Sequence, residues 1–66
     1  MKHSFWYKYY RRKITELEKR DAGIAEIIQY LQKLEMNKHK MYDSELKILQ
    51  SRAYYYLEYT KRRLNI

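Results

Sequence analysis

Apolar residues recur every three to four positions through the first half of the chain. The series starts at Tyr7 and runs to Leu31, and the polar residue Asp21 interrupts it. This spacing lines one side of an α-helix, which would face a core. Ser4 suits the N-cap, because its hydroxyl can accept a hydrogen bond from an early backbone N–H. The pattern therefore predicts one long helix over residues 5–36, with Gly23 as the point where it could bend.

The segment from Asp21 to Gly23 leaves a second interpretation open. Lys19 and Arg20 suit the C-terminus of a helix, Gly23 can adopt a positive φ, and Asp21 can cap a following helix. The apolar series keeps its phase across this segment, however, so the single helix is the favoured prediction.

A second helix is predicted over residues 43–64. Residues 37–42 carry no sustained apolar series and begin at Asn37, which tolerates a left-handed backbone, so they are expected to form a turn. Asp43 or Ser44 would cap the helix that follows. Its apolar face has heptad spacing and consists of Tyr42, Leu46, Leu49, Ala53, Tyr56, Thr60 and Leu64.

A short turn between two helices makes them antiparallel neighbours. The expected fold is therefore all-α, a single domain over residues 1–66 built as a helical hairpin with a coiled-coil-like seam. In that hairpin Tyr56 lies close to Gly23, whose missing side chain would leave room for the ring. Large aromatics at the start would project past the second helix and pack on another copy. We expect them to drive self-association into a helical bundle: Phe5, Trp6, Tyr7 and Tyr10.

Composition limits the chain to one small domain. With 66 residues a single core is marginal, and the absence of cysteine excludes disulfides as a compensation. Two histidines cannot supply a cysteine and histidine zinc site. No run approaches the ~20 apolar residues of a membrane-spanning helix, and the first residues lack the apolar core of a secretory signal. We therefore expect a cytoplasmic protein.

The net charge of +7 is concentrated at the two ends of the sequence. Residues 1–20 carry seven basic and two acidic side chains, residues 21–60 are nearly balanced, and residues 61–66 carry three basic ones. In a hairpin both ends would meet at one pole. Guanidinium groups interleaved with phenols suit a phosphate backbone. The candidate binding residues are Lys8, Arg11, Arg12, Lys19, Arg52, Tyr55, Tyr59, Arg62 and Arg63.

The chemistry of the remaining residues points away from catalysis. The carboxylates fall on solvated helix positions among cations, the serines lack a histidine placed as a base, and no glycine-rich loop is present. We expect no enzyme activity, no cofactor, no metal and no small-molecule substrate. The leading hypothesis is a nucleic-acid-binding protein with little sequence specificity.

Other functions remain open. The alternative is a protein-interaction module, such as a small inhibitor or adaptor that docks its Tyr/Arg helix face on an acidic partner. The same pattern also fits a merely soluble cationic surface. Membrane binding through the aromatic start ranks third. The composition is similar to that of small accessory proteins of phages and other mobile elements, a resemblance that assigns no residues.

Overall fold

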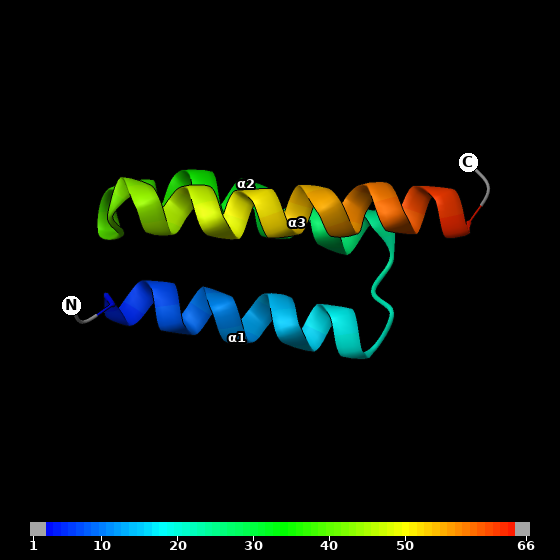
Figure 1. The fold of residues 1–66 in the computed structure, drawn as a ribbon, viewed down its shortest axis with the longest axis horizontal. Coiled ribbons are helices and arrows are strands. Elements are labelled where there is room, and N and C mark those ends of the chain that lie inside the picture. Colours follow the sequence, from blue (N-terminus) through cyan, green and yellow to red (C-terminus); the bar gives the residue numbers. More distant parts are fainter. Residues whose placement is uncertain (1–2, 65–66) are drawn as a thin grey trace.

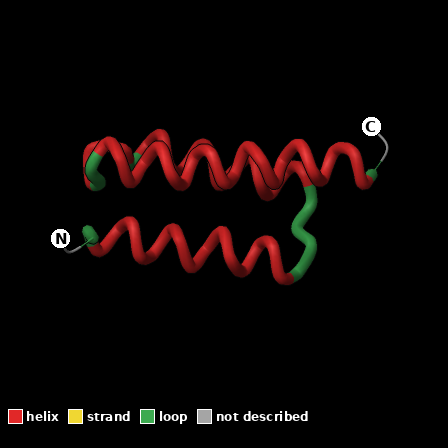
Figure 2. Tube along the Cα trace, in the orientation of Figure 1, coloured by secondary structure: helices red, strands yellow, loops and turns green. Residues whose placement is uncertain are grey.

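The computed structural model describes residues 3–64, which form three α-helices and one short 3₁₀ turn. They are α1 (Phe5–Lys19), α2 (Ile24–Met36), η1 (Lys38–Lys40) and α3 (Asp43–Arg63). Helices α1 and α3 run in the same direction, and α2 runs antiparallel to both (Figure 1). Figure 2 shows that only short loops separate the helices, and no β-strand occurs in residues 3–64. The predicted all-α class is confirmed.

The prediction of one continuous helix over residues 5–36 is wrong, because the chain leaves the helix after Lys19. Asp21 adopts a left-handed backbone with φ 53°. The Ala22 N–H donates to the Leu17 carbonyl at 3.0 Å, and the Asp21 N–H donates to the Glu18 carbonyl at 3.4 Å. These two bonds satisfy the last carbonyls of α1 in the manner of a Schellman motif. The alternative interpretation, a break in this segment, is the one that holds.

Gly23 does not have the roles that the sequence suggested for it. It precedes α2 with φ −77° and ψ 169°, an extended backbone that any residue adopts. No atom lies within 4 Å of the place where its Cβ would stand, so Tyr56 does not pack into its missing side chain. The Tyr56 hydroxyl instead lies 3.4 Å from the Leu17 carbonyl oxygen.

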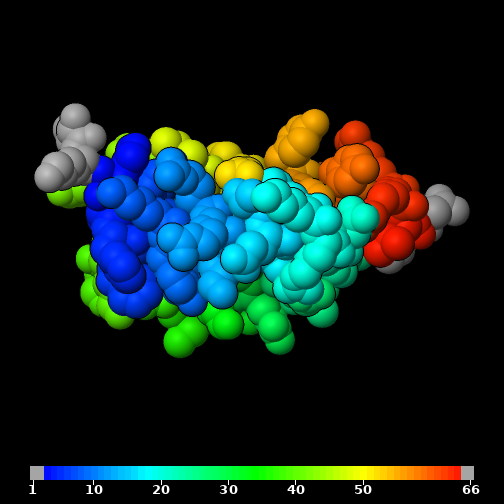
Figure 3. All heavy atoms as spheres, turned by 90° about the horizontal axis from the view of Figure 1, so that it is seen from below, coloured from blue at the N-terminus to red at the C-terminus, as the bar shows by residue number. Residues whose placement is uncertain are grey.

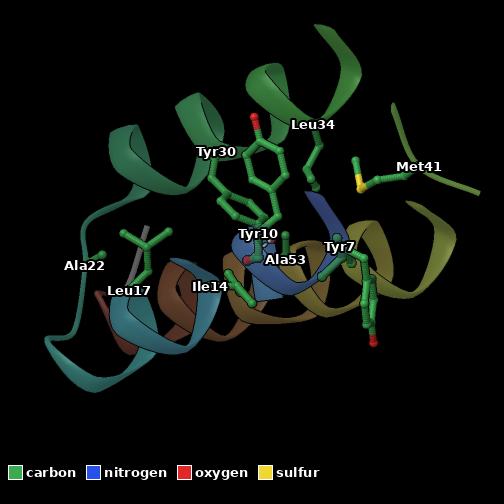
Figure 4. Packing of buried hydrophobic residues seen from close by; sticks show 10 residues of the cluster. Tyr7, Tyr10, Ile14, Leu17, Ala22, Tyr30, Leu34, Met41 and Ala53 are labelled. Carbon is green, nitrogen blue, oxygen red and sulfur yellow. Dashed lines mark hydrogen bonds between the residues drawn. The ribbon is translucent and has the colours of Figure 1, made fainter. Parts of the chain in front are cut away.

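Because α1 folds back on the other two helices, its aromatic residues belong to the core of the same chain. Tyr7 and Tyr10 are 6% and 5% exposed. The Tyr30 hydroxyl donates to the Tyr10 carbonyl at 2.8 Å, and the Tyr10 hydroxyl accepts from the Asn37 amide at 2.9 Å. Figure 4 shows the Tyr10 and Tyr30 rings beside each other within this core. The predicted aromatic overhang is therefore wrong, and Tyr7 and Tyr10 are not accessible to another copy.

Phe5 and Trp6, the other two aromatics predicted to drive self-association, lie nearer to solvent. Phe5 is exposed, whereas Trp6 is half-buried and packs against the core. The Lys40 ammonium lies 4.5 Å from the centre of the Trp6 ring, close enough for a cation–π contact. This contact ties η1 to the first turn of α1.

The inner face of α3 includes the middle of the predicted heptad series. Leu49, Ala53, Tyr56 and Thr60 are buried, whereas Tyr42 and Leu64 at the two ends are exposed. Helix α3 begins after Tyr42 and not after Asp43 or Ser44. The expected cap of α1 is confirmed, since the Ser4 hydroxyl accepts from the Tyr7 N–H at 3.1 Å.

Candidate functional site

The two basic ends of the chain do not meet at one pole. The N-terminal end of α1 and the C-terminal end of α3 lie at opposite ends of the bundle (Figure 1). The prediction that both basic ends meet at one pole is therefore wrong. It required a first helix that runs straight from residue 5 to residue 36. Folding α1 back places it parallel to α3, and the candidate residues then line the length of these two helices.

Arg52 holds α1 and α3 together along this length. Its Nε donates to Glu18 at 3.1 Å, and one of its terminal nitrogens donates to Glu18 at 2.6 Å and to the Thr15 hydroxyl at 3.1 Å. The hydrogen bond to Glu18 raises the pKa of the Arg52 guanidinium, although partial burial opposes this. Forked hydrogen bonds of this kind fix geometry as well as charge. Arg52 therefore positions the helices and is already occupied by Glu18.

The other candidate residues flank this contact on its solvent side. Lys8 and Lys19 lie seven residues before and four after Thr15, so they share its stripe of the α1 surface. Tyr55 and Tyr59 lie three and seven residues after Arg52 and share its stripe of α3. Figure 3 looks onto α1 and shows α3, in yellow to red, along one edge and α2, in green, along the other. We call the surface made by these stripes the α1/α3 face: Lys8, Arg11, Arg12, Lys19, Arg52, Tyr55, Tyr59, Arg62 and Arg63.

The cations of the α1/α3 face differ in their contacts with carboxylates and aromatic rings. Arg63 pairs with Asp21 at 3.2 Å and lies 5.9 Å from the Tyr59 ring centre, and Arg11 lies 5.4 Å from that of Tyr7. The others form no ion pair with any carboxylate of residues 3–64 and are exposed: Lys8, Arg12, Lys19 and Arg62. The free positive charge of this face is therefore mostly on α1.

The two tyrosines of the face are held differently. Tyr55 is 79% exposed, the highest fraction among the large hydrophobic residues of the described chain. Tyr59 stacks on Tyr56 with ring centres 6.0 Å apart and an interplanar angle of 18°. Tyr59 is thus held against Tyr56, whereas Tyr55 forms no aromatic or cation–π contact within residues 3–64.

A buried carboxylate that is not among the candidate residues predicted from the sequence lies at one end of the α1/α3 seam. Glu45 is 2% exposed and accepts four hydrogen bonds, two of them from the Ser4 N–H and hydroxyl at 2.9 and 2.8 Å. The third comes from the Tyr42 N–H at 3.1 Å, and the fourth joins His3 Nδ1 at 3.0 Å. Burial raises the pKa of Glu45, but the hydrogen bonds together outweigh burial and leave the pKa lowered.

Glu45 has a structural role that fits its position three residues after Tyr42. A glutamate at that position commonly accepts from the backbone N–H of the residue that precedes a helix, and this signal was present in the sequence. Its bonds to Ser4 join the start of α1 to the start of α3. Ser4 donates to Glu45 and not to His3, so these residues do not form a nucleophile and base pair.

The described residues offer no better site elsewhere for chemistry. A cavity of about 250 Å³ lies between α1 and α2, lined by cations and carboxylates that include Lys13, Glu16 and Lys33. Arg20 and Glu26, also in its lining, are paired with each other. Residues 3–64 contain no group of three or more potential metal ligands. None of the described helices combines the length and apolar character needed to cross a bilayer.

Comparisons with known proteins found no relative of this chain. No protein-family model, no curated protein and no solved structure matches it.

Proposed function

We propose that the protein binds nucleic acid without catalysing a reaction, by laying the α1/α3 face along a phosphate backbone. The observation that supports this most directly is a set of four exposed cations on the face that have neither a carboxylate partner nor an aromatic-ring contact within residues 3–64: Lys8, Arg12, Lys19 and Arg62. Cations that neutralise phosphates release condensed counterions, which drives binding without reading sequence. Little sequence specificity is the expected result.

Each part of the face has a distinct role in this proposal. Lys8, Arg12 and Lys19 contact phosphates from α1, over about 16 Å between the first and the last at the helical rise. Arg62 adds a contact from α3. Tyr55 stacks on an exposed base or donates its hydroxyl to a phosphate. Arg52, paired with Glu18, keeps the two helices in register.

The dependence of affinity on salt tests the phosphate contacts. Four neutralised phosphates on duplex DNA give a slope of log K against log salt near −4, at about −0.9 per contact. The double variant Arg12→Ala, Lys19→Ala should flatten this slope by roughly two units. The matched control is Lys13→Ala, Lys33→Ala, which removes the same charge from the α1/α2 side. An equal loss in the control would mean that only net charge matters.

The open tyrosine tests the contact with bases. Tyr55→Ala should weaken binding to single-stranded DNA or RNA by about 1–3 kcal/mol and leave the salt slope nearly unchanged, because stacking releases no counterions. Tyr54→Ala is the control, since Tyr54 is also exposed but lies in the groove between α2 and α3. Similar losses from both substitutions would contradict the assignment of Tyr55.

A protein partner is the second candidate function, and one observation favours it. Ile48, four residues before Arg52 on the same stripe, is 52% exposed beside Tyr55. An exposed aliphatic and a tyrosine among arginines are typical of residues that anchor protein interfaces. If the wild type binds neither DNA nor RNA below about 100 µM in low salt, the nucleic-acid proposal fails. The face would then belong to a small inhibitor or adaptor of an acidic partner.

A further inference from the structure

The groove between α2 and α3 differs in character from the α1/α3 face. Glu35 is the one charged residue in its lining. Ile28 and Tyr54 on its two sides are 42% and 56% exposed. Its other lining residues are apolar or amide-bearing: Leu31, Gln32, Gln50 and Leu57.

The solvent side of α2 extends this uncharged surface. Ala25 and Met36 are exposed, and neither carries a charge. The other charged residues of the helix lie toward α1, since Glu26 and Lys33 line the cavity between those two helices. In a chain with 35% charged residues, an uncharged face of this length needs an explanation.

We propose that a second copy of this chain covers the α2/α3 groove, with the two copies related by a two-fold axis. Each copy carries +7, so two copies repel wherever their basic faces meet. The lining of this groove contains no cation. Glutamine amides both donate and accept hydrogen bonds, so Gln32 and Gln50 in the groove can bond to polar groups of the second copy.

The charges at the ends of the groove match under the same symmetry. Glu35 lies at the C-terminal end of α2. Lys61 lies four residues after Leu57 and seven after Tyr54, so it extends their stripe toward the far end of α3. A two-fold axis through the middle of the groove sends each end of one copy to the opposite end of the other. It therefore brings Glu35 of one copy toward Lys61 of the second copy. Within one copy Glu35 pairs with Lys38 and Lys61 pairs with Glu58, but both pairs are solvent-exposed and weak, so they can exchange for a contact between copies.

A specific dimer needs only a small part of the surface of each copy. A standard interface takes about 800 Å² from each partner, roughly a sixth of the 5027 Å² that the chain exposes. The arrangement would leave both α1/α3 faces outward, and it does not depend on nucleic-acid binding.

Sedimentation equilibrium of the full chain tests the proposal. The wild type at about 100 µM should have a mass near twice 8.4 kDa. Ile28→Glu should raise the dissociation constant at least tenfold, because a carboxylate buried without a partner is costly. Ile48→Glu is the matched control on the α1/α3 side, and it should leave the dissociation constant close to that of the wild type. Circular dichroism of both variants separates loss of association from loss of the fold.

Charge exchange tests the two-fold geometry. Glu35→Lys and Lys61→Glu should each weaken association, and the double variant should restore it. A wild type that stays at 8.4 kDa at several hundred micromolar overturns the proposal and leaves the groove to a different partner. Equal dissociation by Ile48→Glu and Ile28→Glu overturns it as well, because association would then not be specific to the α2/α3 groove.

Discussion

At the scale of single residues, Asp21 determines where the first helix ends. It is the one non-glycine residue of the described chain with a positive φ. A left-handed backbone costs an L-residue about 1–2 kcal/mol, and glycine avoids this cost at the expense of chain entropy. Asp21→Gly should therefore raise the free energy of unfolding by about 0.5–1 kcal/mol, measured by urea denaturation.

The ion pair of Asp21 with Arg63 provides the control for this substitution. Asp21 is largely exposed in this pair, so solvent screens the contact and its loss should not cancel the gain. Asp21→Ala removes the same carboxylate but keeps the Cβ, and it should not stabilise the protein. A gain from Asp21→Ala as large as that from Asp21→Gly would show that the carboxylate, and not the backbone, is unfavourable.

Thr60 is a second residue with an unfavourable environment, because its polar side chain is buried. Its side chain is 0% exposed, and its hydroxyl has no hydrogen-bond partner. An unsatisfied buried polar group costs about 1–3 kcal/mol, and valine has the same shape without the hydroxyl. Thr60→Val should raise the free energy of unfolding by about 1 kcal/mol. Thr15→Val should lower it, because the Thr15 hydroxyl bonds the Arg11 carbonyl and Arg52. Thermal melts of the two variants should therefore shift in opposite directions.

At the scale of helices, Glu45 makes the packing of α1 on α3 sensitive to acid. Its pKa is lowered from 4.5 in the folded protein, so the folded state binds the carboxylate proton less well than the unfolded state. The stability that Glu45 provides is present above its unfolded pKa and is lost as the pH falls through its folded pKa. The free energy of unfolding should therefore decrease as the pH falls below about 4.5.

The variant Glu45→Gln isolates this contribution. It should be less stable than the wild type at pH 7, because a neutral amide is a weaker acceptor for the N–H and hydroxyl of Ser4. It should also lose part of the acid sensitivity. Parallel pH curves for the variant and the wild type, measured by urea denaturation, would show that other carboxylates cause the acid unfolding.

The helices themselves could largely be predicted from the sequence, but the break between α1 and α2 could not be decided. Leu17 and Ile24 are seven residues apart, so the apolar series keeps its phase whether or not the helix continues. The decision depends on tertiary packing. Folding α1 back buries Tyr7 and Tyr10 within one chain, which a helix continuing past Lys19 would leave exposed. Helix propensity depends only on the local sequence and does not reflect that burial.

At the scale of the whole molecule, the same break rearranges the candidate site. The basic and tyrosine residues form stripes on each helix, and those stripes depend only on local periodicity. Which stripes come together depends on how the helices are arranged in space. The basic residues therefore lie on a face along α1 and α3 and not at one pole. The partner of Arg52 was likewise unpredictable, since Glu18 is 34 positions away in sequence.

The surplus of positive charge on α1 should make the protein more stable in salt. Its first turn contains no acidic residue to complement the helix dipole, and Lys8 lies three residues before Arg11 and four before Arg12, where like charges repel. The screening length falls from about 30 Å at 0.01 M salt to about 3 Å at 1 M. The repulsion should therefore weaken, and the urea midpoint should rise between about 0.01 and 0.5 M NaCl.

Two variants separate this repulsion from the ion pairs, which salt also screens. Arg12→Gln removes a cation that has no carboxylate partner in residues 3–64, so it should stabilise the protein at low salt and reduce the salt response. Arg52→Gln breaks the bond to Glu18 and should destabilise the protein at every salt concentration. A wild-type midpoint that falls as salt is added would mean that the ion pairs outweigh the repulsion. If it rises instead, a bound polyanion should stabilise the fold by the same relief of repulsion on α1.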